Sequence, residues 1–341
     1  MWPVIGQDRV VSFFQRSLSK GAVAHAYLFV GPPHVGKMTL ALALAQALNC
    51  QAKEPPCGQC PQCRRIASSN HADIQVIDLS SDADLNEGKE RTQISIEQIR
   101  QLQHWASLAP FEGSCRVFII DGAERLSIGA ANCLLKTLEE PPDRVVFVLL
   151  AVNERLLPAT VVSRCQRLEL KPLAISEIAA ALTGRWGVAP EKAELLSRLS
   201  HGHIGWAVAA AGDEKLLEQR SERLGGLLDI IGADYEERFG YAARLATQFS
   251  QKREGVWEVL DLWLDFWRDL LLIKLGLKEA IINRDLESSL ASRADDFSLL
   301  EIKNFIDGIA KVKGQLKQNA NARLVFEVMM LNMPVGKRSV A

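Results

Sequence analysis

A glycine-rich turn near the amino terminus has the residues of a phosphate-binding loop. Residues 31–37 read GPPHVGK, which matches the pattern G-x-x-x-x-G-K after an apolar run and before a helical stretch. Glycines let the backbone wrap a phosphate, the following helix amino terminus offers free N–H donors, and Lys37 would pair with the β- and γ-phosphates. The alternative is a glycine-rich turn without a ligand. The expected nucleotide contacts in this segment are Gly31, Pro32, His34, Val35, Gly36, Lys37, Met38 and Thr39.

The position after the lysine departs from the motif. Met38 stands where Ser or Thr would ligate Mg²⁺, and a thioether is a poor ligand for a hard cation. Thr39 comes one residue late, and we expect it to point elsewhere on the helix. The sequence therefore predicts that ATP or ADP can bind, while Mg²⁺ is held badly.

An acidic residue ends an apolar run further along the chain. Residues 117–120 (VFII) precede Asp121, which would hold Mg²⁺, often through water. Gly122 follows, where hydrolysing P-loop proteins usually have a Glu that polarises the attacking water. The next acid, Glu124, is expected in a turn or a first helical turn beyond the strand, and it is a weak candidate for the base.

Four closely spaced cysteines form the pattern C-x6-C-x2-C-x2-C, at Cys50, Cys57, Cys60 and Cys63. Four thiolates fit a tetrahedral Zn²⁺ site, and the prolines and glycine among them supply turns. Because protein ligands fill all four places, the zinc would be structural. An iron–sulfur cluster is the competing metal site. For the scattered Cys115, Cys133 and Cys165 we expect plain buried or surface positions.

The elements that would position these residues alternate in the first half of the chain. Brief apolar runs rich in β-branched residues predict strands at 27–30, 74–77, 116–120 and 145–150. Helical stretches are expected at 38–48, 96–107 and 127–139, the last stopped by the prolines at 141 and 142. This βαβ series predicts a doubly wound α/β domain with a parallel sheet.

After residue 170 the pattern becomes helical. Short helices are expected at 176–182 and 190–199, with a break at 201–205 (HGHIG), and long amphipathic stretches dominate from 214 onward. One apolar helix face is marked at i, i+3, i+4 spacing by Trp257, Leu260, Leu264, Trp267 and Leu271. We interpret it as core.

Composition excludes several classes of protein. The chain has 341 residues, of which 48% are apolar, so a disordered or fibrous chain is excluded. Lys and Arg total 40 against 41 Asp and Glu, so any DNA contact must be a local patch or be shared with partners. The most apolar run, 145–152, is too short to span a bilayer, and the start lacks a signal-peptide core. With seven cysteines and no export signal, disulfides are disfavoured and the cytoplasm is the expected location.

Several blocks together resemble one family. In chain order they are 4–7 (VIGQ), 25–32 (HAYLFVGP), the four cysteines, 134–142 (LLKTLEEPP), 163–165 (SRC) and 318–324 (QNANARL). They are similar to the bacterial sliding-clamp loader, an AAA+ assembly within the DNA polymerase III holoenzyme. The resemblance covers essentially the whole chain and is strongest over residues 4–170.

The resemblance implies an architecture of three domains. These are an AAA+ P-loop domain with a parallel sheet at 1–172, carrying an inserted zinc module at about 50–63, a small helical lid domain at 173–212, and an all-α collar domain at 213–341. It further implies a five-subunit ring of delta, three ATPase subunits and delta prime, joined through their collars, which opens the sliding clamp and loads it on primer-template DNA.

Four departures favour the delta prime type over the ATPase (gamma/tau) type, which is the alternative. Met38 replaces the metal-binding hydroxyl and Gly122 replaces the Glu after Asp121. Val152, or the adjacent Asn153, stands where the ATPase type has a sensor Thr, and Gly205 stands where it has a sensor Arg. Each change removes a group that recognises or activates the γ-phosphate, so we expect ATPase activity to be weak or absent.

Arg164, in the SRC block, matches the family pattern, unlike the four positions above. In the family this Arg is an arginine finger, inserted into a neighbouring subunit's ATP site to stabilise charge on the transferring phosphoryl group. The chain is thus expected to be a stator that acts in trans. A third possibility, a nucleic-acid-binding protein that reads DNA with its cysteine module, is disfavoured by the near-neutral charge.

Overall fold

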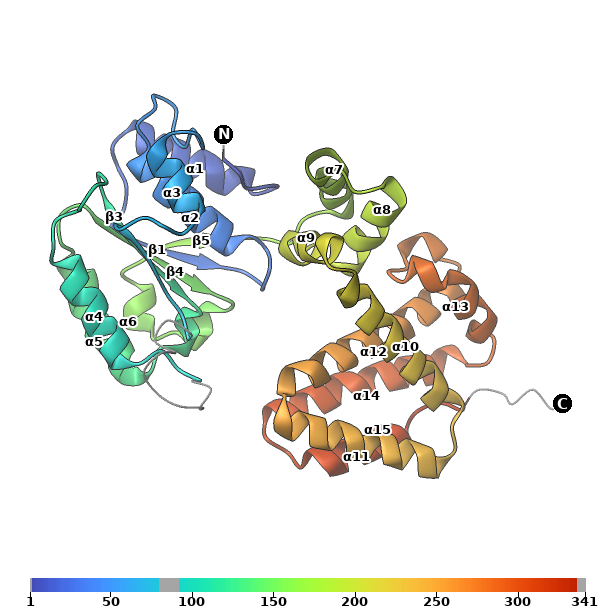
Figure 1. The fold of residues 1–341 in the computed structure, drawn as a ribbon. Coiled ribbons are helices and arrows are strands. Elements are labelled where there is room, and N and C mark those ends of the chain that lie inside the picture. Colours follow the sequence, from blue (N-terminus) through green and yellow to red (C-terminus); the bar gives the residue numbers. More distant parts are fainter. Residues whose placement is uncertain (1, 80–91, 336–341) are drawn as a thin grey trace. The chain divides into compact units, whose positions relative to one another are not determined.

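The computed structural model describes residues 2–79 and 92–335, in two compact units. The first unit combines Met1–Ala181 with His201–Trp206, and the second combines Leu182–Ser200 with Ala207–Ala341. Figure 1 draws the α/β fold of the first unit and the helices of the second. The expected lid residues 173–212 are divided between the two units. The three-domain boundaries stay a prediction, and residues 336–341 of the expected collar lie outside the described part.

The first unit is built on a parallel sheet of five strands in the order β2-β3-β4-β1-β5. The strands are β1 (Ala26–Val30), β2 (Ile74–Ile77), β3 (Arg116–Asp121), β4 (Val145–Ala151) and β5 (Gln166–Glu169). The first four confirm the predicted strands and the predicted parallel α/β class. β5 was not predicted, because it is a mostly exposed, polar edge strand without an apolar run.

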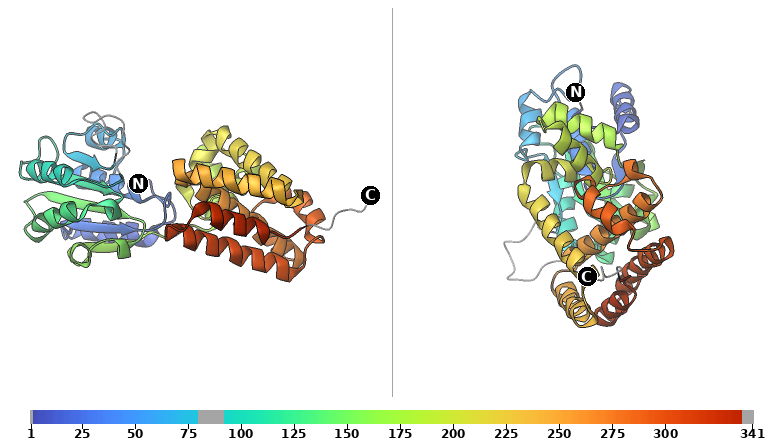
Figure 2. Two further views of the ribbon diagram at one scale, coloured as in Figure 1. Left: turned by 90° about the horizontal axis from the view of Figure 1, so that it is seen from below. Right: turned by 90° about the vertical axis from the view of Figure 1, so that its right-hand side faces the viewer.

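Helices cover both faces of this sheet, because the central strands are apolar on both sides. Along β1, Leu28 packs with α4 and α5, whereas Tyr27 and Phe29 pack with α1 and α2 on the opposite face. The views in Figures 1 and 2 show these helices as layers on either side of the strands. The helices of this unit's sheet are α1 (Asp8–Ser19), α2 (Lys37–Asn49), α3 (Pro61–Ala67), α4 (Ile96–Ala106), α5 (Ile128–Glu139) and α6 (Ala159–Val162).

Local sequence explains where these helices begin and end. Ser95 starts α4 with a capping box closed by Gln98, and Ser127 accepts the N–H of Ala130 at the start of α5. α3 was not predicted: Pro61, which we took for a turn residue, occupies its first position, where the missing N–H costs nothing. Two short 3-10 turns, at Ala123–Arg125 and Glu154–Leu156, follow β3 and β4.

The later helices confirm the predicted helical half. They are α7 (Ile175–Trp186), α8 (Pro190–Leu199), α9 (Ile204–Gly212), α10 (Glu214–Gly232), α11 (Tyr235–Gln251), α12 (Arg253–Lys274), α13 (Glu287–Ala294), α14 (Leu299–Lys317) and α15 (Ala322–Leu331), with 3-10 turns at Lys278–Ala280 and Arg284–Leu286. The predicted break after α8 is present, with positive φ at His201 and Gly202, but Ile204 and Gly205 already belong to α9. Within the two described ranges, no helix combines the length and apolar composition needed to cross a bilayer.

The core of the second unit centres on α12. Trp267 is fully buried there, with ring centroids 4.8 Å from Phe305 and 5.2 Å from Phe297. The predicted stripe was only partly right: Leu260 and Trp267 are buried, but Trp257, Leu264 and Leu271 are half-buried at its margin. The buried face is wider than the stripe, because Trp263, Phe266 and Leu270 also point inward.

Candidate nucleotide-binding site and metal centre

The predicted phosphate-binding loop joins β1 to α2. Its first residue needs to be glycine for packing: a Cβ on Gly31 would lie 2.5 Å from the carbonyl oxygen of Leu170. Gly36 has φ 102°, a left-handed value that glycine adopts without strain, and α2 begins at the next residue. The local geometry therefore depends on both glycines of the motif.

Lys37 is turned onto the loop's own backbone. Its Nζ donates to the carbonyl oxygens of Gly31 at 2.6 Å and Pro32 at 2.8 Å. The pKa of Lys37 is lowered because its side chain is buried. The negative charges of Glu124 and Asp121 offset part of this effect. The ammonium therefore has two backbone acceptors and two nearby carboxylates before any phosphate arrives.

A cavity of about 560 Å³ opens beside this loop. Most of the predicted nucleotide contacts line it: His34, Gly36, Lys37, Met38, Thr39 and Asp121. Thr39, which we expected to point elsewhere, borders the cavity as well, because the first turn of α2 opens into it. Val35 is instead 1% exposed in the core, and Gly31 and Pro32 contribute through the carbonyls that hold Lys37.

The four family departures come together in this one cavity. Met38, Gly122, Val152 and Gly205 all line it, although they come from four separate parts of the chain. Of the two alternatives at the sensor position, Val152 faces the cavity, whereas the Asn153 side chain accepts the N–H of Arg155 to cap a 3-10 turn. The groups that differ are thus neighbours in space.

Gly205 seals one side of the loop. Its N–H donates to the carbonyl oxygen of His34 at 2.8 Å, and a Cβ at this position would lie 2.9 Å from the same oxygen. His34 itself has φ 60°, an uncommon value for a non-glycine residue. With the loop in this arrangement, residue 205 can carry no side chain unless the backbone of the loop shifts.

Sequence reasoning undervalued the two residues that follow the acidic strand. Glu124 and Arg125, in the 3-10 turn after β3, both line the cavity. Oε2 of Glu124 is inaccessible to solvent and has no hydrogen-bond partner among the described residues. The alternation of β3 does not extend into this turn, so only the proximity of Glu124 to Asp121 hinted at its position. Asp78, Leu79, Leu150 and Ala151 also line the cavity without having been predicted.

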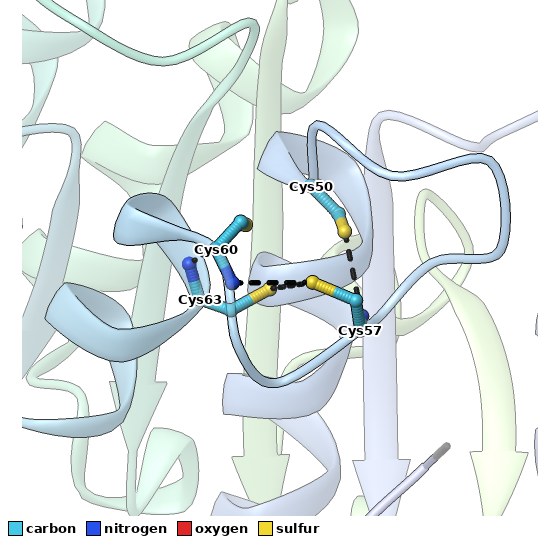
Figure 3. Close-up of side chains that lie close together, drawn as sticks. All are labelled: Cys50, Cys57, Cys60 and Cys63. Carbon is cyan, nitrogen blue, oxygen red and sulfur yellow. Dashed lines mark hydrogen bonds between the residues drawn. The ribbon is translucent and has the colours of Figure 1, made fainter.

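The four predicted cysteine ligands gather where α2 ends and α3 begins, with Cys63 inside α3 (Figure 3). The Sγ atoms of Cys50, Cys57, Cys60 and Cys63 all lie within 4.8 Å of one another. Ligand atoms about 2.3 Å from a tetrahedral zinc would be roughly 3.8 Å apart, so a small contraction brings these thiols onto one ion. The donor set therefore fits a tetrahedral metal.

Backbone amides point at these sulfurs. Cys57 Sγ accepts N–H groups of Gln59 at 3.4 Å and Cys60 at 3.3 Å, which lower the pKa of Cys57 to about 6. Cys50 Sγ accepts the N–H of Cys57 at 3.4 Å. Burial raises the pKa of Cys63 to about 12. Metal binding would oppose that effect, because the metal stabilises the thiolate.

The remaining cysteines lie apart from this cluster. Cys115 is buried, and Cys133 and Cys165 are half-buried. Burial raises the pKa of Cys115 and of Cys165 to about 12, so both are neutral thiols at neutral pH.

Arg164 lies on the surface of the first unit. Its Nη2 is 2.6 Å from Oε1 of Glu139 at the end of α5, and Nη1 donates to the carbonyl of Thr160 at 3.0 Å. The side chains of Arg164 and Glu139 are 35% and 51% exposed. The guanidinium is therefore held in place by its own chain yet remains accessible.

Comparison with known proteins identifies the family. The family model described as "DNA polymerase III, delta subunit" matches residues 6–174, and "DNA polymerase III, delta subunit, C terminal" matches residues 218–334. The chain is also 29% identical over 331 residues to the DNA polymerase III subunit delta' of Bacillus subtilis, covering 97% of each. The chain belongs to the clamp-loader family of DNA polymerase III subunits.

The chain is also similar to two further proteins with DNA polymerase III names. The chain is 27% identical to the tau subunit of Bacillus subtilis over 97% of its own length, but it spans only 60% of that longer relative. A solved gamma-subunit-related protein of Thermotoga maritima is 20% identical, with a TM-score of 0.47, and covers 94% of this chain and 97% of that one. The family resemblance stated from the sequence is confirmed by the family models, and the expected parallel α/β sheet is present.

Proposed function

We propose that this chain is a delta prime-type clamp-loader subunit that turns over little or no ATP and acts on a neighbouring subunit. The observation that carries the proposal is the lining of the nucleotide cavity, where Met38, Gly122, Val152 and Gly205 meet. Similarity along the whole length of a delta' relative supports the same type.

Each of these four residues removes one interaction that hydrolysis needs. Met38 offers no hard oxygen to Mg²⁺, and Gly122 offers no carboxylate to the attacking water. The side chain of Val152 cannot donate a hydrogen bond, and Gly205 cannot supply a cation to the γ-phosphate. Losing all four at one cavity leaves Lys37 and Asp121 without the groups that would complete a catalytic site.

Nucleotide binding without turnover is compatible with this cavity. ATP or ADP would contact the loop N–H groups and Lys37, with Asp121 as the remaining acidic partner for Mg²⁺. Binding would have to draw Lys37 away from the carbonyls of Gly31 and Pro32. It would also bring phosphate close to the carboxylate of Glu124. We therefore infer weak binding of nucleotide and weaker binding of its metal.

Arg164 is the residue we assign to the reaction in trans, as an arginine finger for the ATP site of an adjacent subunit. Its accessible guanidinium supports this assignment, because a planar fork can pair with phosphoryl oxygens once it leaves Glu139. The role requires a neighbour, so this chain alone would not reveal it.

The four cysteines are proposed to hold one structural zinc ion. The close Sγ cluster and the N–H···S contacts support zinc over a disulfide, and four protein ligands leave no open position for catalysis. Bound zinc would fix the segment between α2 and α3.

The assembly follows from the family. We propose that the collar helices join this chain to gamma/tau and delta subunits, and that the ring loads the sliding clamp on primer-template DNA in the cytoplasm. The chain makes no chemical bond itself, although it is a component of a nucleotidyltransferase holoenzyme.

The competing function is a gamma/tau-type ATPase, which the retained Lys37 and Asp121 favour. ATP turnover by the purified chain separates the two, with Lys37→Ala as the control for contaminating activity. We expect the rate to equal that of Lys37→Ala. Turnover that Lys37→Ala abolishes would assign the ATPase role instead, and reconstitution with gamma/tau and delta subunits then tests assembly.

A further inference from the structure

The loop between α4 and β3 presents an unusual amount of apolar surface. Residues 107–115 form this loop, and within it Phe111 is 80% exposed and Leu108 is 43% exposed. An exposed Phe on an irregular segment would be expected to move freely. Instead, the backbone beside it is tied down from two directions.

The first anchor is a buried carboxylate at the start of β2. Asp73 accepts the N–H groups of Phe111 at 2.7 Å, Glu112 at 2.9 Å and Gly113 at 2.7 Å. Nε of Arg116 lies 3.2 Å from the same carboxylate, whose side chain has no exposed surface. Charge-assisted bonds of this kind give the loop one defined backbone conformation.

The second anchor is the cysteine module. On α3, Nε2 of Gln62 donates to the carbonyl of Glu112 at 3.2 Å, and Arg65 forms an ion pair with the Glu112 carboxylate. The ring of His71 contacts Oε1 of Gln62 at 2.6 Å and so fixes that amide. Glu112, next to Phe111, is thereby held by two side chains of one short helix.

The module also holds the far end of the loop. Asn49 directly precedes Cys50, and its Oδ1 accepts the N–H of Cys115 at 3.0 Å. A Cβ on Gly113 would lie 2.4 Å from this oxygen, so the loop approaches the module at a glycine. Contacts from both ends of the cysteine segment therefore converge on residues 112–115.

These contacts position Glu112 only as firmly as α3 itself is held in place. The helix has seven residues, too few for stability on its own, and Cys60 caps its start while Cys63 lies within it. Gln46 of α2 adds one bond, from Nε2 to the carbonyl of Cys63 at 2.8 Å. A metal joining Cys60 and Cys63 to Cys50 and Cys57 would fix the helix far more firmly.

We propose that the metal centre braces the loop at residues 107–115 through Gln62 and Arg65, so that metal occupancy sets the position of Phe111. This inference rests on the metal centre proposed above. Gln62 and Arg65 are positioning residues in it: they belong neither to the lining of the nucleotide cavity nor to the cysteine cluster, and they transmit the placement of α3 to Glu112.

Amide hydrogen exchange of the full chain, loaded with zinc or treated with chelator, tests the brace. Chelation should speed exchange of the amides at 111–113 by about tenfold, since losing a hydrogen bond to a charged group changes protection on that scale. Exchange in β1 and β4 should stay unchanged. Acceleration confined to residues 50–66 would overturn the proposal, and so would equal acceleration throughout the sheet.

Variants separate the brace from the metal. Gln62→Ala combined with Arg65→Ala should speed exchange at 111–113 with zinc still bound, and chelation should then add little. Arg64→Ala, at the exposed position directly before Arg65 on α3, is the matched control and should behave like the unmodified chain. Arg65→Lys, which keeps the charge opposite Glu112, should restore part of the protection.

Zinc content, measured on every sample, distinguishes the two proposals. Zinc at one per chain with no effect of chelation on the loop refutes the brace alone. Absence of zinc from protein prepared without chelator refutes the metal centre and, with it, the brace. Additive effects of the double variant and chelation would also contradict transmission through these two side chains.

Discussion

Replacing Arg164 with Ala separates a role in trans from a role in folding. The change removes an ion pair of 2.6 Å between side chains that are 35% and 51% exposed, and one bond to the carbonyl of Thr160. A solvent-screened pair of this kind contributes about 0.2–1 kcal/mol. The melting temperature of the purified chain should therefore fall by at most about 4 °C.

The functional loss should be far larger than the structural one. An arginine finger is worth ~10³–10⁵ in rate at the site it completes. Only the site next to this chain loses it, so bulk ATP hydrolysis by the reconstituted ring can fall partially. Clamp loading on primed DNA is the sharper assay, because it requires the whole cycle. We expect Arg164→Ala complexes to assemble normally and to load clamps much more slowly.

Three matched variants isolate the cause. Glu139→Gln removes the same ion pair but keeps the guanidinium, so it should load clamps normally. Arg164→Lys should fail, because an ammonium lacks the planar fork. Arg100→Ala, at an exposed position of α4, should have no effect. If Arg164→Ala complexes load clamps and consume ATP at the unmodified rate, Arg164 is not an arginine finger and the stator proposal fails.

Three other expectations follow from the candidate sites and from the core of the second unit. Metal analysis should find about one zinc per chain, and finding iron instead of zinc would refute the zinc site. Cys60→Ser should lower the metal content and the stability, while circular dichroism shows that the fold is retained. Glu124→Gln should tighten Mg²⁺-free ADP binding by about tenfold in calorimetry, since it removes a negative charge beside Lys37; weaker binding would show that Glu124 assists the ligand. Arg238 is 1% exposed and donates to the carbonyls of Ile230, Ile231, Met333 and Pro334. Arg238→Met should therefore lower the free energy of unfolding in urea by about 3 kcal/mol, and an unchanged midpoint of the urea transition would contradict this.

The sequence predicted the sheet well where strands are buried on both faces. β3 and β4 lie at the centre, so their apolar runs are long and unmistakable. β5 carries Gln166, Arg167 and Glu169 on an exposed edge, and composition alone does not distinguish it from a loop. The buried face of α12 was predicted too narrow because this helix has too many apolar residues rather than too few. Apolar residues cover most of its circumference, so the choice of one stripe was arbitrary.

For the candidate site, the sequence predicted residue types better than their contacts. Motif spacing named Lys37, the four cysteines and the departures at Met38 and Gly122, and the family resemblance added the departures at Val152 and Gly205. Neither could predict that Lys37 would bond the loop's own carbonyls, because that depends on how the loop closes beneath His34 and Gly205. Glu124 was undervalued because its position relative to Lys37 is set by the turn after β3, which carries no periodic signal.

The loop geometry also offers a structural reason for a phosphate-loop motif in a subunit that we propose to hydrolyse little or no ATP. The N–H of Gly31 donates to Ala151 at 3.1 Å, and a Cβ there would lie 2.5 Å from the carbonyl of Leu170, just after β5. The turn from α6 to β5 carries Arg164. Because residue 31 is glycine, β5, the strand that follows Arg164, can pair closely with β1.

Gly31→Ala tests this structural explanation. Without any nucleotide, it should destabilise the chain by about 1–3 kcal/mol in urea unfolding, since backbone atoms cannot yield as a flexible side chain does. Lys37→Met, the control at the other end of the motif, removes the phosphate-binding ammonium without introducing such a clash, and it should cost less. If the motif were kept only for nucleotide, Gly31→Ala would leave stability unchanged until ATP or ADP was added. That result would restore ligand binding as the reason for the glycine.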